Sequence, residues 1–426
     1  MSKLKVTTLF SGIGAQEAGL KRLGVDFEMV GMCEIDKYAI KSYEGINGPT
    51  HNYGDISKID RLDYADLLVY SSPCVDFSLA GKQAGLIDTD GKQTRSGLLL
   101  EVGRLLMKMS DEKILPKYLL MENVKNLVGK KFKPAFDIWL KALEAIGYNN
   151  YWKVLNAKDY GVPQNRERVF VVSIRKDVDT HGYTFPEPFK LNRRLKDVLE
   201  KEVDEKFYLK QDLAKSFIER LSKREVSNTI RCGGAGSIDQ KHTWDLVVGS
   251  TQKNAYKGQT SGISPCLTGA MGMGGGQIPM IVNGEVEGIN QKHTWDSVAE
   301  PFVLEKGIGH NPVSKKFEFD GFHENKPCPT LLATDYKCPK CYSDGVRIRK
   351  LTPKECWRLM DFTDEEYEAA EKAGVSKTQL YKQAGNSIVV SCLAHIFREL
   401  LKGTEYEPEE GFKTDWLERL KGTNNA

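Results

Sequence analysis

Three short segments of the chain carry side chains that could act together on a pyrimidine ring. Each adjoins an apolar run of the kind that forms a buried strand: Cys74 follows one run, Glu122 ends a second, and Arg166 and Arg168 open a third. A thiolate can add to a ring carbon, a carboxylic acid can share a proton with a ring nitrogen, and a guanidinium can stabilise charge on a carbonyl oxygen. If the runs are neighbours in one parallel sheet, the three groups converge at its carboxyl edge.

Other roles for these residues stay open on the sequence alone. A cysteine in a cytosolic chain is most often a small buried residue. Glu122 could cap the turn at Asn123, and Arg166 or Arg168 could form a structural salt bridge. A proline directly before Cys74 fixes the backbone there, which favours a nucleophile presented at a strand end.

The elements that would position these residues alternate along the first 180 residues. The predicted strands cover residues 5–10, 27–34, 66–71, 117–121, 151–155 and 168–175. The predicted helices cover residues 15–23, 36–43, 97–109 and 134–146. This alternation is typical of a doubly wound α/β sheet, a Rossmann-like architecture with helices on both faces.

The composition changes after residue 180. Prolines and a charged segment mark a boundary, and Gly-rich stretches with short apolar pieces between them predict a smaller domain, mostly of β-hairpins and loops, over 187–345. A motif that ends in Lys-His-Thr-Trp-Asp occurs twice within it, as residues 238–245 and 289–296. The repeat is compatible with two turn modules that bury their tryptophans, or with modules that touch phosphates through their Lys and His side chains.

The alternation of strand and helix returns near the end of the chain. Residues 387–401 are predicted to form an amphipathic helix after a turn at Gly385 and Asn386. We expect the first domain to cover residues 1–180 and to be completed by residues 379–402. Residues 346–378 would lead back to it from the smaller domain, and residues 403–426 would form a loosely held polar tail.

Six sequence elements follow one another along the chain. They are Phe10-Ser11-Gly12-Ile13-Gly14, Pro73-Cys74-Val75-Asp76-Phe77-Ser78, Glu122-Asn123-Val124, Gln164-Asn165-Arg166-Glu167-Arg168, Arg349-Lys350-Leu351-Thr352-Pro353-Lys354-Glu355-Cys356 and Gly385-Asn386-Ser387. In this order they resemble the motifs of the cytosine-C5 DNA methyltransferases of bacteria and phages. The resemblance spans residues 4–180 and 345–400, and the part between them is the stretch that differs among members of that family.

The resemblance implies methyl transfer from S-adenosylmethionine to C5 of a cytosine that has been flipped out of duplex DNA. Cys74 would add to C6, Glu122 would hold a proton at N3, and Arg168 would contact O2 of the base. Arg166 would do the same or hold the catalytic loop. The segment after Cys74 would form the loop that closes over the base.

Residues at strand ends and near the end of the chain are expected to bind the cofactor. Gly12 and Gly14 allow the first turn to approach a ligand closely, and Phe10 could lie against the adenine ring. Glu34 would bind the ribose hydroxyls and Asp55 the adenine amino group. The full predicted set is Phe10, Gly12, Ile13, Gly14, Glu34, Ile35, Asp55, Ile56, Pro73, Leu98, Asn386 and Ser387.

Double-stranded DNA is the expected partner. A net charge of +3 is nearly neutral, so a local basic cleft would have to attract the DNA. Arg231, in the smaller domain, is the best candidate for a contact with a guanine edge. The predicted DNA contacts are Ser78, Lys82, Gln83, Arg95, Gln164 and Arg231.

The composition bounds the class of protein. With 426 residues, of which 40% are hydrophobic and 28% charged, the chain is expected to be globular, and no apolar run approaches the roughly 20 residues of a membrane span. No signal core follows the N-terminus, and nine cysteines without the spacing of a secreted scaffold predict reduced thiols in a bacterial cytoplasm.

One cysteine pair has a spacing known from zinc sites. Cys338 and Cys341 are separated by two residues, and Cys328 and His323 lie upstream as further possible ligands. This stretch resembles ordinary family sequence that needs no metal, so we expect none.

Three functions compete. We expect a sequence-specific DNA methyltransferase, the modification half of a restriction system or a phage self-protection enzyme, that acts as a monomer and needs no stable contact with a restriction enzyme. A tRNA cytosine methyltransferase would share the catalytic segments, but such relatives lack a large variable segment like the one at 185–345. A catalytically silent DNA-binding protein on the same scaffold is the third reading, and the joint presence of Cys74, Glu122 and Arg168 argues against it.

Overall fold

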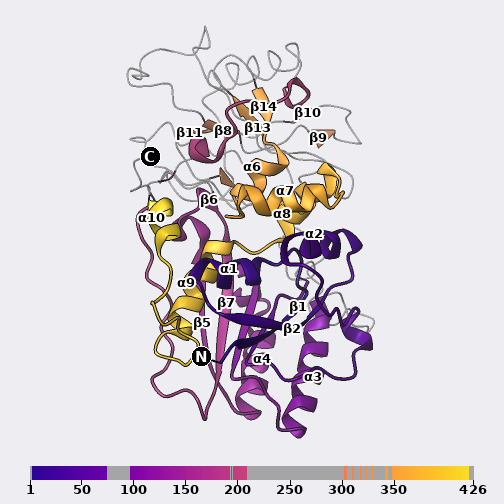
Figure 1. Ribbon diagram of the computed structural model, residues 1–426, viewed down its shortest axis with the longest axis vertical. Helices are drawn as coiled ribbons and strands as arrows, with labels where there is room; N and C mark the ends of the chain where they lie inside the picture. The colour runs from indigo at the N-terminus through magenta and orange to yellow at the C-terminus, as the bar shows by residue number, and fades with distance from the viewer. Residues whose placement is uncertain are drawn as a thin grey trace.

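The computed structural model describes residues 2–73, 96–191, 193, 195–208 and 348–421, together with short strands between residues 302 and 343. The central element of these residues is a six-stranded sheet with helices on both faces. In Figure 1 helices α6, α7 and α8 lie above the sheet, at the end opposite to the N-terminus.

The central sheet has the strand order β2-β1-β3-β4-β7-β5. Its strands are β1 (Leu4–Leu9), β2 (Phe27–Cys33), β3 (Leu67–Tyr70), β4 (Tyr118–Val124), β5 (Tyr148–Asn156) and β7 (Glu167–Arg175). Strands β2, β1, β3 and β4 are parallel neighbours, whereas β7 is antiparallel to both β4 and β5. The predicted α/β class is confirmed, with one reversed strand.

The reversed strand corrects the expectation that the three catalytic segments lie in one parallel sheet. Only η4 (Ala157–Tyr160) and β6 (Gln164–Asn165) connect β5 to β7, and parallel neighbours need a crossover of about a dozen residues or more. Because β7 is reversed, its first residues lie beside the last residues of β4, and Arg168 pairs with Val124. The start of β7 and the end of β4 therefore share an edge of the sheet.

Alternate residues of a strand enter two hydrophobic cores, one on each face of the sheet. Leu67 and Val69 of β3 belong to the core that α1 and α9 cover. Leu68 and Tyr70 belong to the core that α3 and α4 cover. The covering helices are α1 (Ala15–Leu23), α3 (Leu99–Asp111), α4 (Lys133–Ala145) and α9 (Val390–Leu401).

The predicted connection at 346–378 is largely helical. It holds α6 (Pro353–Arg358), α7 (Asp364–Lys372) and the start of α8 (Lys377–Asn386), and α7 packs against α2 (Lys37–Asn47). Helices α6 and α7 each begin with a capping box, in which a threonine hydroxyl and a glutamate side chain bond to each other's backbone amides. These boxes were the signal in the sequence that could have revealed both helices.

Gly385 and Asn386 form the last turn of α8, which corrects the prediction of a turn before the next helix. The Arg166 guanidinium donates to the carbonyls of Gly385 and Ser387, at 3.2 and 2.7 Å. These donors satisfy carbonyl groups that the end of a helix leaves without partners, so the helix can continue through a glycine.

The end of the chain packs onto the first domain, which corrects the prediction of a loosely held tail up to residue 421. Helix α10 (Asp415–Lys421) buries Trp416, Leu417 and Leu420 in the core shared with α1 and α9. The Trp416 ring meets the ring of His395 edge-on, with 4.9 Å between the centroids. Three apolar residues on one helical face are too few to stand out in a polar segment.

The chain enters and leaves the predicted smaller domain through two adjacent segments. Glu355, which is fully buried, accepts two hydrogen bonds from the Arg349 guanidinium, at 2.9 and 2.8 Å, and one from the Glu200 amide at 2.9 Å. The Thr352 hydroxyl donates to the Glu200 carboxylate. We call these four residues the neck clasp, since Glu200 lies near the start of the predicted smaller domain (187–345) and the other three follow its end.

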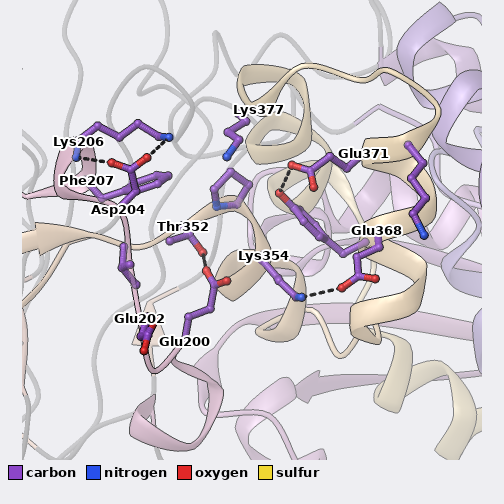
Figure 2. Close-up of a pocket in the computed structure, with 14 residues that line it drawn as sticks. Glu200, Glu202, Asp204, Lys206, Phe207, Thr352, Lys354, Glu368, Glu371 and Lys377 are labelled. Carbon is purple, nitrogen blue, oxygen red and sulfur yellow. Dashed lines mark hydrogen bonds and ion pairs between the residues drawn. The ribbon is translucent and has the colours of Figure 1, made fainter.

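A cavity of 460 Å³ opens beside the neck clasp (Figure 2). Acidic and basic side chains line it together with Phe207 and Tyr367. The ammonium groups of Lys206 and Lys377 lie 5.6 and 5.9 Å from the centroid of the Phe207 ring. The cavity thus lies between residues 200–207, near the start of the predicted smaller domain, and helices α6 and α7.

The remaining described elements are short. The strands outside the sheet are β8 (Phe302–Leu304), β9 (Gly309–His310), β10 (Phe317–Glu318), β11 (Phe322–Glu324), β12 (Cys328–Pro329), β13 (Cys341–Ser343) and β14 (Ile348–Lys350). Further 3-10 turns are η1 (Ile56–Lys58), η2 (Ser96–Leu98), η3 (Lys125–Val128), η5 (Leu195–Val198) and η6 (Glu205–Phe207). Within the ranges given above, no helix is long and apolar enough to cross a membrane.

Candidate active site

The shared edge of β4 and β7 brings a carboxylate and a guanidinium together. Glu122, near the end of β4, is 5% exposed, and its Oε1 lies 3.1 Å from Nε of Arg168 at the start of β7. The chain reaches the same edge again at Pro73, just after β3, while Cys74 itself lies outside the described residues. A buried acid beside a guanidinium suits a site where charge develops on a bound base.

The residues after β3 are tied to the end of β4. The Ser71 hydroxyl donates to Glu122 Oε2 over 2.7 Å. Asn123 Nδ2 donates to the Ser72 carbonyl over 3.1 Å, and Asn123 is only 1% exposed, so this side chain serves the neighbouring backbone. The sequence does not reveal these serines as part of the site, because both bonds join segments 51 residues apart.

Arg166 is a buried residue that reaches the end of α8. It is 4% exposed, and its guanidinium binds the carbonyls of Gly385 and Ser387 at the end of α8. Of the two roles predicted for it, contact with the base or support of the site, these bonds favour support. Arg166 anchors the segment of Asn386 and Ser387 to the start of β7.

The turn after β1 is strained and open. Phe10, Gly12 and Gly14 have φ angles of 58°, 59° and 86°, a conformation that a residue such as Phe10 rarely adopts. At Gly14 the φ of 86° favours glycine, and a Cβ there would also lie 2.5 Å from Nδ2 of Asn47, which would have to move. A Cβ at Gly12 would meet no atom of the described residues within 4 Å. Open space therefore adjoins Gly12, where a ligand could approach the backbone.

Glu34, directly after β2, organises this turn. Its Oε2 accepts from the Gly12 amide at 2.9 Å, and its Oε1 accepts from the amides of Ile35 and Asp36 at 2.8 and 2.9 Å. Three of the about four lone-pair positions of the carboxylate are used, so one stays open to a hydroxyl donor. Ile35 is 71% exposed, and its side chain is available to cover a ring bound beside Glu34.

Other predicted cofactor residues differ in what they can offer. The Asp55 side chain is 38% exposed, and it caps η1 by accepting from the Ser57 amide at 3.1 Å. Ile13 and Ile56 are 2% and 3% exposed and fill the two hydrophobic cores, so only their backbones could face a ligand. Pro73 and Leu98 are half-buried.

Helix α8 is fastened beside this turn. Lys382 Nζ lies 2.7 Å from the carboxylate of Asp36, the N-cap of α2, and Gln383 Nε2 donates to the Tyr38 carbonyl over 2.9 Å. Asn386 is exposed at the end of α8, while Ser387 is 8% exposed. The far end of the chain is thereby held against the segment that follows Glu34.

The family model for C-5 cytosine-specific DNA methylases matches residues 4–402. The chain belongs to this family. Among its relatives, the orphan methyltransferase M.SPBetaI of Bacillus phage SPbeta is 35% identical, over 94% of this chain and 98% of the relative. The orphan methyltransferase M.SPRI of Bacillus phage SPR is 33% identical over the same shares. The type II methyltransferase M2.ScrFI of Lactococcus lactis subsp. cremoris is 31% identical, over 94% of this chain and 99% of the relative.

Solved structures of methyltransferases share the fold. The S. pombe Dnmt2 methyltransferase aligns with a TM-score of 0.53 at 16% identity, over 94% of this chain and 99% of that chain. A putative DNA modification methyltransferase encoded within an E. coli prophage aligns with a TM-score of 0.51 at 20% identity, over 93% and 98%. These identities show the fold alone, whereas the family match makes the protein a DNA (cytosine-5-)methyltransferase.

Asn52 supports the open turn of the methylase, and no pattern in the sequence pointed to it. Its Oδ1 accepts from the amides of Glu34 and Gly54, at 3.2 and 2.9 Å, and its Nδ2 donates to the Glu34 carbonyl at 3.0 Å. One amide side chain thus fixes Glu34 relative to the segment that carries Asp55.

Gln164, predicted to contact DNA, has a different place in the methylase. Its side chain is fully buried, and Nε2 donates to the Leu359 carbonyl over 2.7 Å. It therefore joins β6 to the end of α6, because an amide buried in this way needs a partner inside the protein. The other predicted DNA contacts, Ser78, Lys82, Gln83, Arg95 and Arg231, lie outside the described residues.

In the part of the chain that the structure describes, no three or more His, Cys, Asp or Glu side chains are grouped so as to hold a metal ion. Cys338 lies outside the described residues, as do the side chains of His323, Cys328 and Cys341.

Proposed function

We propose that the methylase modifies a flipped cytosine with Cys74 as nucleophile, Glu122 as the group that holds a proton at N3, and Arg168 as the donor to O2. The observation that carries this proposal is the buried Glu122–Arg168 pair at the edge where the chain runs into Pro73. A guanidinium fixed there can stabilise the charge that grows on the base when a thiolate adds to it.

The chemistry needs these groups in a fixed order. The Cys74 thiolate forms a bond to C6, and the electron pair of the C5–C6 bond becomes available at C5 while Glu122 holds the N3 proton. Bound S-adenosylmethionine would supply an electrophilic methyl group, to which C5 would form its new bond while the sulfur keeps the bonding pair and leaves as S-adenosylhomocysteine. Loss of the C5 proton then expels the thiolate and restores the aromatic ring, now methylated at C5.

Cys33 is a second thiol near this edge, and its surroundings support the choice of Cys74. It is 2% exposed, and its Sγ lies 2.8 Å from the Gly54 carbonyl. Burial raises the pKa of Cys33 to about 12, so its thiol stays protonated at neutral pH. A protonated thiol is not a nucleophile, and Cys33 is therefore structural.

We infer that S-adenosylmethionine binds along the turn after β1. Glycine at position 12 leaves room for the ligand, Glu34 keeps one acceptor position for a ribose hydroxyl, and the exposed Ile35 offers an apolar surface to the adenine ring. The Asp55 side chain is 38% exposed and Asn386 is exposed, so both can add polar contacts.

Trapping on a modified base tests the catalytic assignment. A duplex with 5-fluorocytosine at the target should form a covalent adduct with the wild-type enzyme, because fluorine cannot leave C5 as a proton does. Cys74→Ser should form no adduct and transfer no methyl group while duplex binding is largely retained, since a hydroxyl is a far poorer nucleophile than a thiolate. An adduct with Cys74→Ser, or none with the wild type, would overturn the assignment.

Calorimetry with S-adenosylhomocysteine tests the cofactor site. Glu34→Ala and Asp55→Ala should each weaken binding by roughly 1–3 kcal/mol, because a partner on the ligand is left without its hydrogen bond. Asp60→Ala, an exposed aspartate after η1, is the matched control and should leave the affinity unchanged. Unchanged affinity in both test variants would move the cofactor elsewhere.

We further propose that residues 187–345 form the domain that reads the target sequence. The neck clasp brings the two ends of this part together, since Glu200 near its start binds Glu355 and Thr352 just after its end. Arg231→Ala should cost roughly 1–3 kcal/mol on the cognate site if Arg231 forks onto a guanine. An equal, smaller loss on every sequence at fixed salt would make it a phosphate contact instead.

Self-protection of a phage or prophage genome is the role that the relatives favour. Two phage relatives are named orphan methyltransferases, which suggests that this enzyme also works without a restriction partner. We infer that it acts as a monomer on double-stranded DNA in the bacterial cytoplasm. Sequencing of methylated duplex DNA for 5-methylcytosine, with a parallel assay on tRNA, would give the target site, and methylation of tRNA alone would refute the DNA target.

A further inference from the structure

The two oxygens of the Glu122 carboxylate are held by residues from two different strand ends. Arg168 Nε, at the start of β7, lies 3.1 Å from Oε1, and Ser71 Oγ, just after β3, lies 2.7 Å from Oε2. Arg168 has a role in the proposed reaction, whereas Ser71 has none in it. Its hydroxyl nevertheless makes the shorter of the two contacts.

Two donors on opposite oxygens restrict a glutamate more than one donor does. The terminal torsion of a glutamate side chain has a broad range, so a carboxylate held at one oxygen can still turn about that bond. A second donor, on a different strand, fixes the plane of the carboxylate before the base arrives. A group held in its reactive orientation needs no further ordering when the substrate binds.

The serine itself stands on a rigid support. The Ser71 amide donates to the Leu9 carbonyl of β1 over 3.4 Å, and the next residue, Ser72, accepts a hydrogen bond from Asn123 of β4 through its carbonyl. The backbone at Ser71 is thus held from both neighbouring strands. Its hydroxyl can therefore hold the Glu122 carboxylate in place rather than merely follow it.

A hydroxyl suits a partner whose protonation changes. It can donate to an ionised carboxylate and accept from a protonated one, which neither an ammonium nor a guanidinium can do. Glu122 shares a proton with N3 in the proposed reaction, so Oε2, the oxygen that Ser71 contacts, must keep a partner whether the carboxyl is ionised or protonated. We propose that Ser71 is a positioning residue for methyl transfer, which orients the Glu122 carboxyl together with Arg168; this inference rests on the proposed function.

The substitution Ser71→Ala tests this role. Under single-turnover conditions with saturating cofactor, methyl transfer should slow roughly ten-fold, the equivalent of about 1.4 kcal/mol, while KM for the duplex and the melting temperature change little. Ser173→Ala is the matched control. Ser173 is 1% exposed and donates to Asn150 Oδ1 over 2.6 Å, a serine bond between two strands that does not touch Glu122, so its loss should leave the rate unchanged.

A double-mutant cycle decides whether Ser71 acts through Glu122. In the Glu122→Gln background, Ser71→Ala should cause no further loss in the rate of adduct formation with a 5-fluorocytosine duplex, followed over hours. A full ten-fold loss in that background, or a wild-type rate for Ser71→Ala alone, would overturn the inference. Failure of the wild-type enzyme itself to form an adduct would instead refute the proposed function, so the two failures can be told apart.

Discussion

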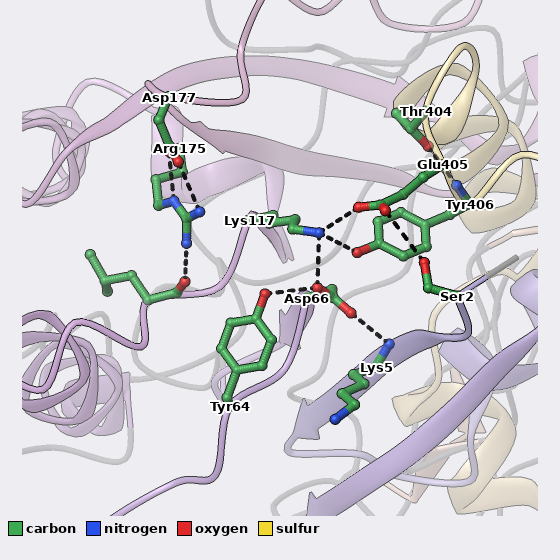
Figure 3. Close-up of polar contacts among 11 residues, drawn as sticks. Ser2, Lys5, Tyr64, Asp66, Lys117, Arg175, Asp177, Thr404, Glu405 and Tyr406 are labelled. Carbon is green, nitrogen blue, oxygen red and sulfur yellow. Dashed lines mark hydrogen bonds and ion pairs between the residues drawn. The ribbon is translucent and has the colours of Figure 1, made fainter.

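Charged side chains gather at both edges of the central sheet: the amino edge, where the parallel strands begin, and the carboxyl edge, where they end. The two groups differ in whether their charges find partners within the chain. At the amino edge, Asp66 accepts from the Lys5 amide at 3.0 Å and from the Tyr64 hydroxyl at 2.8 Å. Lys117 Nζ lies 3.3 Å from Asp66 and 2.6 Å from Glu405, as Figure 3 shows. Each charged group in this network is therefore paired with another group of the same chain.

The carboxyl edge is built around space that the described residues leave open. Phe10 holds a left-handed backbone conformation, Gly12 borders on unfilled space, and Ile35 is largely exposed. Strained backbone and exposed apolar surface lower stability, and such features persist where a ligand uses them. A polar network that is closed indicates support of the fold, and one that is open indicates function. The following experiments test this difference.

The largest effect is expected at the carboxyl edge. Glu122→Gln keeps the shape of the side chain but cannot hold a proton for N3, so the rate of methyl transfer should fall roughly 10²- to 10⁴-fold. The free energy of unfolding should change little, because the amide oxygen can accept from Arg168 while the amide NH2 donates to the Ser71 hydroxyl. Single-turnover rates and urea unfolding measure the two quantities. A variant that lost stability and kept its rate would reverse the comparison between the edges.

At the amino edge the opposite result is expected. Lys117→Met leaves Asp66, whose side chain is 8% exposed, with a buried charge and one partner fewer, which should cost about 2 kcal/mol in the free energy of unfolding. The rate of methyl transfer per folded molecule should not change. Lys3→Met is the control, since its exposed pair with Asp26 should contribute no more than about 0.5 kcal/mol. A loss of rate in Lys117→Met would couple this edge to catalysis.

The sequence predicts well what depends on local pattern. Helix α1 has the bounds expected for it at 15–23, because glycines stand at both of its ends. The apolar runs mark Glu122 and Arg168 as residues at strand ends, but their meeting depends on the reversal of β7, since Arg168 at the start of a parallel strand would lie at the opposite edge. The short connection between β5 and β7 was the one signal for that reversal.

What depends on contacts between distant segments could not be predicted. The bonds from Asn52 to Glu34 and from Ser71 to Glu122 join side chains whose neighbourhood exists only after the sheet has formed. The segment of helix α10 likewise has the composition of a polar tail, and only the contact between Trp416 and His395 shows that it packs onto the domain. In each case tertiary packing decides, and a single sequence carries little trace of it.

Acid and base should affect the two edges in opposite directions. Burial opposes ionisation of Asp66, but hydrogen bonds from Lys5 and Tyr64 lower its pKa overall, whereas burial raises the pKa of Glu17, which lies beneath the turn after β1. Asp66 therefore stabilises the fold above its ordinary pKa of 3.8, and this stability is lost as the pH falls below it. Glu17 keeps a proton that the unfolded chain releases above pH 4.5, so its contribution declines as the pH rises.

Urea unfolding across pH would check both signs. In Asp66→Asn, the free energy of unfolding should fall less in acid than it does in the wild type. In Glu17→Gln, the free energy of unfolding should rise relative to that of the wild type as the pH rises from 4 to 8. If Glu17→Gln instead lost stability steadily toward pH 8, the buried carboxyl would be ionised and the two edges would not differ in this respect.

The smallest effect concerns a single exposed side chain. If the apolar surface of Ile35 covers the adenine ring, Ile35→Ser should weaken the binding of S-adenosylhomocysteine by about 1 kcal/mol, the value of some 40 Å² of apolar contact. The free energy of unfolding should not fall, because the side chain is already 71% exposed in the folded protein. Ile138→Ser is the matched control: Ile138 is 69% exposed on α4, so the same substitution there should change neither quantity. Equal affinities for both variants and the wild type would show that Ile35 is ordinary surface, and the carboxyl edge would then lose one of the features that distinguish it from the amino edge.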